Sequence, residues 1–327
     1  MTIMLEQLRA EAQRFLVAHE RPKRCPPLVA LARSYGGTEA DADEVLVFGD
    51  SVAGRTARYD VLRATLTGLV AEGLAPAQRT CAVVHAGFHP GVFSALTKAL
   101  RALPQRPRVI VVPINIRCIS PQWARNPKWQ FEHVVTAVEM FAEGQTAIPR
   151  MTLDVVPAQA SVEEFLATPA GVVGFEGWTV GDFERRVRKA APVPLSEVER
   201  RRLTFAYHYL SLADPASPRI KALEELATTG EALGCAVVAY LTPINHEAGR
   251  RLLGGVFDEV LAANVDVVLT ALRSAGMTTG PGTSVEDWSR LLSSEAFFHE
   301  LLPTEHLNES GRRRLAREIV GMTKAAS

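Results

Sequence analysis

The sequence predicts an α/β fold, namely a three-layer α/β/α sandwich around a mainly parallel central sheet. Three observations lead to this prediction. Short apolar runs rich in β-branched residues recur along the chain, they are apolar throughout rather than alternating, and a stretch with helical periodicity follows most of them. Strands that are buried on both faces are typical of parallel sheets covered by helices on both sides.

The pattern assigns most of the chain to strands and helices in turn. We expect strands over residues 44–48, 81–85, 109–112, 235–241 and 265–269. We expect helices over residues 1–20, 55–72 and 247–263, a helix that ends near Leu103, and two helical stretches between 196 and 233. The last helix begins near Asn308, because asparagine is a favoured N-cap residue.

The middle of the chain breaks this alternation. Scattered Pro and Gly residues interrupt residues 123–194, which carry little strand–helix rhythm of their own. We therefore expect residues 1–327 to form one domain, with 123–194 as an insertion or cap over the sheet. A separate domain in this region is the alternative interpretation.

Composition narrows the class of protein. Lys plus Arg equals Asp plus Glu at 36 each, so no overall charge favours a nucleic-acid or anionic-membrane partner. The four cysteines, Cys25, Cys81, Cys118 and Cys235, are widely spaced, which is typical of reduced thiols. No segment reaches the length of a membrane span, and residues 1–20 lack a signal peptide's apolar stretch. We expect a cytoplasmic protein that acts on a small molecule, without metal or cofactor; the oligomeric state does not follow from the sequence.

Two polar segments stand where chemistry is expected. In parallel sheets the active site lies beyond the carboxyl ends of the strands. Ser51, in Gly49-Asp50-Ser51-Val52, follows the first predicted strand. His306 stands just before the Asn308-capped helix, and a serine hydroxyl needs such a base to become a nucleophile at neutral pH. Taken singly, the two segments are also compatible with a plain turn and a surface histidine.

Together these segments resemble the first and last signature blocks of the SGNH/GDSL hydrolase superfamily. Gly87, in His85-Ala-Gly-Phe-His-Pro90, and Asn115, in Val112-Pro-Ile-Asn-Ile-Arg117, stand where that superfamily has its middle blocks. The resemblance implies a flavodoxin-like sandwich in which Ser51 is the nucleophile and His306 the base. It also implies an oxyanion hole formed by the Gly87 backbone N–H and the Asn115 side-chain amide.

The chain departs from the superfamily pattern in two places. Its third block reads Pro113-Ile-Asn-Ile-Arg-Cys118 instead of Gly-x-Asn-Asp, which is closer to the D-alanyl-transfer and O-acetyltransferase branches. The aspartate that usually stands three residues before the histidine is replaced by Pro303. Glu305 and Glu300 are the local candidates for the orienting acid; a Ser–His dyad is the alternative.

Further polar residues on the predicted site loops are candidates for substrate binding, with helix capping as the other interpretation. These residues are Asp50, His89, Arg117, Asn245 and His246. The sequence thus predicts a serine-dependent esterase or acyltransferase acting on an ester or thioester of a small molecule or carbohydrate. The alternatives are a binding protein that has lost catalysis, and a pocket reused for non-hydrolytic small-molecule biosynthesis.

Overall fold

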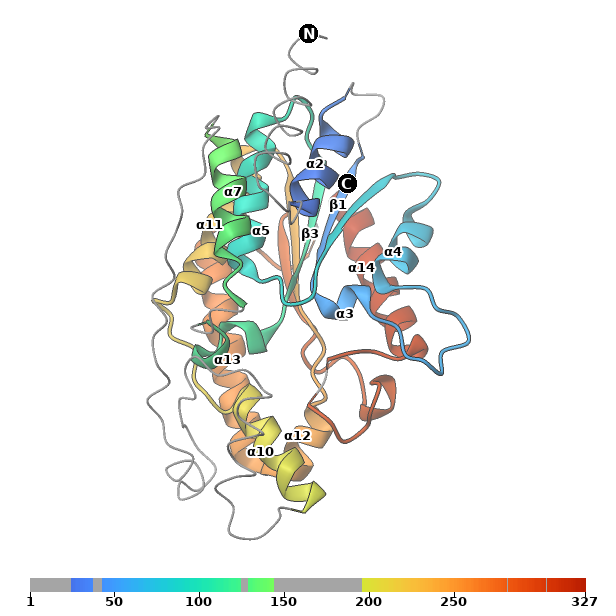
Figure 1. The fold of residues 1–327 in the computed structure, drawn as a ribbon, viewed down its shortest axis with the longest axis vertical. Helices are drawn as coiled ribbons and strands as arrows, with labels where there is room; N and C mark the ends of the chain where they lie inside the picture. The colour runs from blue at the N-terminus through green and yellow to red at the C-terminus, as the bar shows by residue number, and fades with distance from the viewer. Residues whose placement is uncertain (1–24, 38–42, 125–128, 144–195, 281, 304) are drawn as a thin grey trace, which may run out of the picture.

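The centre of the protein is a five-stranded parallel sheet (Figure 1). A computed structural model describes residues 25–37, 43–124, 129–143, 196–280, 282–303 and 305–327. The strands are β1 (Val45–Gly49), β2 (Thr80–Val84), β3 (Val109–Ile114), β4 (Ala236–Leu241) and β5 (Ser284–Asp287), in the order β2-β1-β3-β4-β5. All neighbouring strands run parallel, so the predicted α/β sandwich with a parallel sheet is confirmed.

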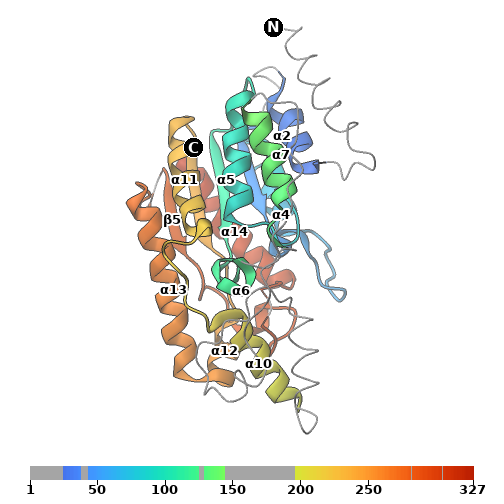
Figure 2. The same cartoon turned by 60° about the vertical axis from the view of Figure 1, so that its left-hand side comes forward.

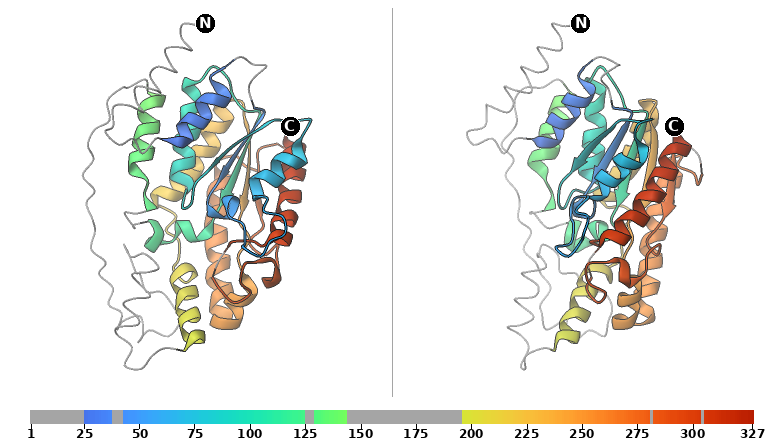
Figure 3. Two further views of the ribbon diagram at one scale, coloured as in Figure 1. Left: turned by 45° about the vertical axis from the view of Figure 1, so that its right-hand side comes forward. Right: turned by 90° about the vertical axis from the view of Figure 1, so that its right-hand side faces the viewer.

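Helices cover both faces of the sheet (Figure 3). One face carries α2 (Pro26–Tyr35), α5 (Pro90–Ala99), α7 (Glu132–Ala142), α11 (Pro218–Ala232) and α13 (Gly255–Ser274). The other carries α4 (Leu66–Leu74) and α14 (Glu309–Ala326), which pack against each other. Short helices occupy the connections: α3 (Ser51–Gly54), η2 (Leu100–Ala102), η3 (Ile116–Ile119), α6 (Pro121–Ala124) and η5 (Ser294–Ala296).

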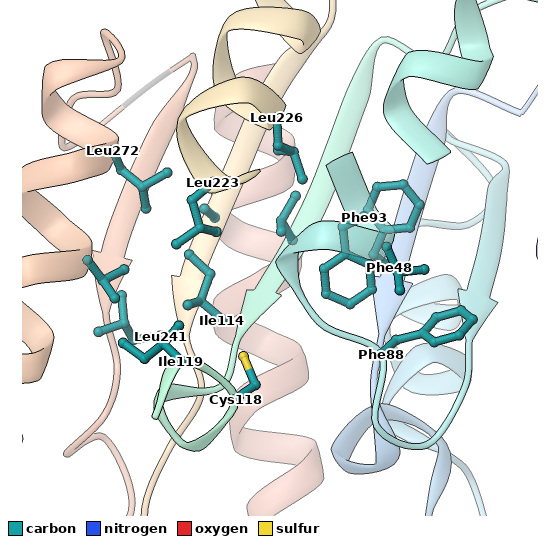
Figure 4. Packing of buried hydrophobic residues seen from close by; sticks show 14 of the residues in the cluster. Phe48, Phe88, Phe93, Ile114, Cys118, Ile119, Leu223, Leu226, Leu241 and Leu272 are labelled. Atoms are coloured by element: carbon teal, nitrogen blue, oxygen red, sulfur yellow. The ribbon is translucent and has the colours of Figure 1, made fainter. Parts of the chain in front are cut away.

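The strand residues alternate between two cores, one on each face. Leu46 and Phe48 of β1 point into the α5 side, whereas Val45 and Val47 point into the α14 side. On the α5 side the Phe48 and Phe93 rings stack with their centroids 5.1 Å apart (Figure 4). Each such buried side chain stabilises the fold by about 2 kcal/mol, and this packing fixes the end of β1 from which the next segment leaves.

The carboxyl ends of the strands point towards α10 (Glu197–Tyr209) and α12 (His246–Leu253) (Figures 1 and 2). These two helices contact each other at that end of the molecule. The loop after β3 is anchored there, because Cys118 and Ile119 are buried in the core near Ile114 and Leu241 (Figure 4). The expected site end is therefore built on a rigid base.

The prediction of a strand over 265–269 is wrong, because these residues lie inside α13. Val265 and Val268 are buried while Asp266 between them is exposed, and Leu261 and Leu272 continue the same buried stripe. This spacing of three and four residues is that of a helix, and burial of one face outweighs the strand preference of valine. The fifth strand is instead β5, which the sequence analysis missed.

Two predicted helices have different bounds. Residues 55–72 begin with a long loop and reach α4 only at Leu66, since α3 ends at Gly54. The helix over 247–263 is broken at Gly254, whose φ of +70° is accessible to glycine at little cost. The helices between 196 and 233 and the helix after Asn308 are confirmed.

The remaining expectations fall partly outside the described residues. Residues 1–20 lie outside them, as do 144–195, which make up most of the expected insertion. From residues 123–194 the structure describes 123–124 and 129–143, and the latter include α7, which packs against α5. Cys25, Cys81, Cys118 and Cys235 are buried free thiols. No helix in the described residues combines the length and apolarity that crossing a bilayer requires.

Candidate active site

Ser51 is the first residue of α3, directly beyond β1. All five residues of β1 are buried, and Asp50 caps the helix by accepting a 2.8 Å hydrogen bond from the Val52 backbone N–H. Gly49 is required at this junction, because a Cβ atom there would lie 2.5 Å from the Ala53 Cβ. The strand end and the cap together fix the Ser51 side chain at the carboxyl end of the sheet's strands.

Ser51 and His306 are in hydrogen-bond contact although they lie 255 positions apart in the sequence. The distance between Ser51 Oγ and His306 Nε2 is 3.0 Å. Burial, together with the nearby cations Arg117 and Arg55, lowers the pKa of the His306 imidazole to about 3. His306 is therefore neutral at pH 7 and free to accept a proton, which is the state a general base needs.

Glu305, the predicted orienting acid, contacts other partners. Its fully buried carboxylate accepts a hydrogen bond from the Tyr209 hydroxyl of α10. The second carboxylate oxygen forms an ion pair with the Arg117 guanidinium over 2.9 Å, but the geometry of this contact is not that of a hydrogen bond. Burial raises the pKa of Glu305, and Arg117 opposes this rise. Glu305 directly precedes His306 in the sequence, but in the structure the Glu305 carboxylate points to Tyr209 and Arg117.

Asn115 and Asp50 form a buried pair beneath Ser51. The Asn115 Nδ2 donates to the Asp50 carboxylate over 3.0 Å, while its Oδ1 accepts from the Arg117 backbone N–H over 3.1 Å. Burial raises the pKa of Asp50, and the hydrogen bond from Asn115 counteracts this rise. The amide nitrogen of Asn115 carries a second N–H, so holding Asp50 and donating to an oxyanion are compatible.

Gly87 lies in the turn that follows β2, beside the end of β1. The His85 backbone N–H donates to the Gly49 carbonyl over 3.1 Å, which keeps the two loops adjacent. Gly87 has a φ of +87°, and a Cβ atom there would lie 2.6 Å from the Trp129 ring. Both the backbone conformation and the contact with Trp129 therefore require glycine at this position.

Arg117 is held in place by its neighbours. Its guanidinium carbon lies 4.7 Å from the centroid of the Trp123 ring, in addition to its ion pair with Glu305. Trp123 in turn donates to the His208 imidazole over 3.3 Å. The aromatic residues before α7 thus anchor the loop after β3.

Two other predicted substrate ligands act as helix caps. His89 caps α5 by accepting from the Gly91 N–H, and its Nε2 contacts the Gln130 carbonyl. Burial and Arg219 lower the pKa of His89 to about 3. Asn245 caps α12, and its amide donates to three carbonyls of the segment before His306: those of His299, Glu300 and Leu302. Both side chains thus hold loops around the site.

His246 lies in a different electrostatic environment from His306. It is half-buried at the start of α12, and burial is the main cause that lowers its pKa. The charged groups that act on it are Glu247, Arg250 and Arg290, none of which acts on His306. The role of His246 in substrate binding stays a prediction.

A buried ion pair, which the sequence analysis did not single out, fastens the Ser51 side of the site to the His306 side. Arg312 of α14 is fully buried and donates to the Asp60 carboxylate over 2.7 Å. The same guanidinium donates to the Leu307 carbonyl, next to His306, and to the Ala64 carbonyl. A signal for it existed, since Arg312 shares the buried face of its helix with Leu315, Ala316 and Ile319.

Tyr209 is the other residue that sequence reasoning missed. It is contributed by α10, far along the chain from Glu305, and no local pattern connects the two.

No cluster of three or more His, Cys, Asp or Glu side chains suited to a metal ion occurs within the ranges given above.

Comparisons with known proteins yield distant structural likenesses only. No family model matches the chain, and no curated protein matches it. The acetylxylan esterase Axe2 from Geobacillus stearothermophilus is 12% identical, with a TM-score of 0.40, over 88% of this chain and 96% of that one. A catalytic mutant of the same esterase gives 11% identity and a TM-score of 0.39, over 86% of this chain and 93% of that one. At these values the likeness supports no inference about the reaction.

Proposed function

We propose that the protein is a serine-dependent esterase or acyltransferase that acts on an ester or thioester of a small molecule or carbohydrate. The single observation that carries the proposal is the 3.0 Å contact between Ser51 Oγ and a neutral His306 Nε2. The four sequence blocks that resemble the SGNH/GDSL superfamily support it independently.

The proposed reaction has two halves. The Ser51 oxygen attacks the substrate carbonyl while its proton passes to His306 Nε2, and the protonated imidazole then gives that proton to the departing alcohol or thiol. In the second half, water or an acceptor hydroxyl attacks the acyl group on Ser51 and loses its proton to His306 Nε2. The protonated imidazole then returns this proton to Ser51 Oγ as the bond between that oxygen and the acyl group breaks. The charged oxygen of each tetrahedral intermediate is held by the Gly87 N–H and the Asn115 amide.

The proposed catalytic pair lies beside a buried polar network. Glu305 is engaged by Tyr209 and Arg117, and Pro303 stands at the superfamily's aspartate position. Arg117 and Arg55 oppose protonation of His306 in the resting enzyme. Because its carboxylate is held by these two partners, Glu305 is not the group that orients the His306 imidazole in the proposed mechanism.

Labelling with a fluorophosphonate probe tests this proposal. We expect one covalent adduct, mapped to Ser51 by peptide mass spectrometry and lost in Ser51→Ala. Ser274→Ala is the matched control, because Ser274 is exposed at the end of α13. A folded protein that remains unmodified at Ser51 contradicts the proposal.

The engagement of Glu305 also favours a second candidate function, a binding protein that has kept the fold and lost catalysis. This candidate predicts that 4-nitrophenyl acetate turns over no faster with the wild type than with Ser51→Ala.

A further inference from the structure

The loop between α3 and α4, residues 55–65, lies beside both members of the Ser51–His306 pair. The Arg55 backbone N–H donates to the Ser51 carbonyl over 3.1 Å, so Arg55 stands one helical turn beyond the serine. The Tyr59 hydroxyl donates to the Phe298 carbonyl over 2.7 Å, and the Phe298 ring lies 5.5 Å from the His306 ring. This loop therefore forms one rim of the site.

The rim loop is held from inside by its only acidic residue. Asp60 is buried and accepts hydrogen bonds from the Ala57 and Glu309 backbone N–H groups as well as from Arg312. The Leu62 N–H donates to the Glu309 carboxylate. These bonds fix the loop without using any of its own arginine side chains.

Those arginines give the rim an unbalanced positive charge. Arg55, Arg58 and Arg63 are all exposed, and none of them forms an ion pair within the described residues. The one loop carboxylate, on Asp60, is already paired with Arg312. This concentration of charge contrasts with the chain as a whole, in which acidic and basic residues are equal in number.

We infer that the rim loop binds an anionic group of the substrate, a carboxylate or a phosphate, with Arg55 nearest to the reacting carbonyl. The planar guanidinium suits both anions, because it donates two parallel hydrogen bonds to them. Since the loop is preformed, binding the anion does not require the backbone to become ordered. The exposed Tyr59 and Val61 lie between the arginines in the sequence and offer apolar surface to the rest of the substrate.

Of the three rim-loop arginines, Arg55 is the one whose charge acts on His306, in addition to burial and Arg117. It contributes to the lowered pKa of His306, whereas Arg58 and Arg63 do not. An anion that neutralised Arg55 would make His306 a stronger base, so the correct substrate would also promote proton abstraction. This inference rests on the proposed function, since it names the substrate class of the same site.

The test compares esters that differ in the place of the negative charge. The probes are neutral 4-nitrophenyl acetate, mono(4-nitrophenyl) glutarate with a carboxylate on the acyl side, and acetyl-coenzyme A with phosphates on the leaving group. The measured quantity is the kcat/KM of a charged probe divided by the kcat/KM of the neutral probe. We expect Arg55→Gln to lower this ratio by roughly three- to tenfold for one charged probe, which is the effect of losing one partly exposed hydrogen bond between charged groups. Arg55→Lys should restore part of that ratio. Added salt should lower the ratio in the wild type.

Arg273→Gln, at the exposed end of α13, is the control and should leave the ratio unchanged. A change with the glutarate ester places the anion on the acyl side, and a change with acetyl-coenzyme A places it on the leaving group. The inference would be overturned if the ratio were the same in three proteins: the wild type, Arg55→Gln, and the triple variant Arg55→Gln, Arg58→Gln, Arg63→Gln.

Calorimetry separates failure of this inference from failure of the proposed function. Glutarate and coenzyme A are titrated into Ser51→Ala, with and without Arg55→Gln. Weaker binding after Arg55→Gln supports the anion site even if no ester is hydrolysed and Ser51 is never labelled. Binding that is absent from both proteins, or equal in both, overturns the anion site even if 4-nitrophenyl acetate is a good substrate.

Discussion

The two halves of the candidate site are built in different ways. Ser51 is placed by regular structure, because a buried strand, a glycine and a capped helix succeed one another within seven residues (Val45–Ser51). His306 lies in an irregular segment between η5 and α14, and two side chains from elsewhere hold that segment: Asn245, the N-cap of α12, and Arg312 of α14. The serine side thus depends on local sequence and the histidine side on long-range hydrogen bonds. Mutations should therefore disturb the two halves differently.

The largest expected effect comes from removing either member of the pair. Ser51→Ala and His306→Ala should each lower kcat for 4-nitrophenyl acetate by about 10³-fold or more, because neither residue activates the attack alone. The double variant should be about as slow as either single variant, which steady-state kinetics would show. Losses that multiply in the double variant would mean that the two side chains act separately.

Arg312 tests the connection between the halves. Arg312→Met leaves the Asp60 carboxylate buried without its cation, so we expect the free energy of unfolding to fall by about 3–5 kcal/mol in urea titrations. Arg313→Met, at the next and exposed position, should cost less than about 1 kcal/mol. A stable Arg312→Met variant with wild-type labelling of Ser51 would show that the two halves hold together without this ion pair.

Asn245 tests the histidine side alone. Asn245→Ala removes the donor to the carbonyls of residues 299, 300 and 302, at an expected cost of about 1–3 kcal/mol. It should also slow fluorophosphonate labelling of Ser51, because the segment before His306 loses its support. Ser217→Ala, which removes the N-cap of the remote α11, should cost about 1 kcal/mol and leave the labelling rate unchanged. Equal labelling rates in both variants would contradict the proposed support.

The smallest effect concerns pH. Because the pKa of His306 is lowered to about 3, the labelling rate should stay level from pH 8 to about pH 5 and fall only as the pH approaches that value. In the unfolded chain His306 has a pKa near 6.5, so between about pH 3 and pH 6.5 the unfolded state binds more protons than the folded state. The free energy of unfolding therefore decreases as the pH falls from about 6.5 towards 3. His306→Gln should remove this contribution, which urea titrations at several pH values would detect. A rate that halves near pH 6.5 would contradict the lowered pKa.

The same contrast explains what the sequence could predict. The strands β1 to β4 were predictable because each is a continuous apolar run, and Ser51 follows directly from the first of them. Strand β5 was not, because it has only four residues and ends in Glu286 and Asp287, as an edge strand does. His306 was located through its resemblance to a known motif rather than through local periodicity.

The partners of the buried charges lay beyond sequence reasoning. The Tyr209–Glu305–Arg117 cluster joins three segments from different parts of the chain, so its formation depends on how α10 packs over the strand ends. Likewise, His89 and Asn245 carry the groups expected of substrate ligands, yet the packing of α5 and α12 turns both into caps. Polar residue types on site loops therefore indicate the region of the site better than they indicate individual roles.

The long sequence separation of Ser51 and His306 has a consequence for synthesis on the ribosome. A growing chain contains the serine long before the histidine, since the two lie 255 positions apart in the sequence. At typical translation rates this gap corresponds to roughly 10–50 s, during which the hydroxyl has no imidazole to activate it. Under the proposed function, the nascent polypeptide is thus unable to attack esters, and the Ser51–His306 pair forms only once α14 has docked.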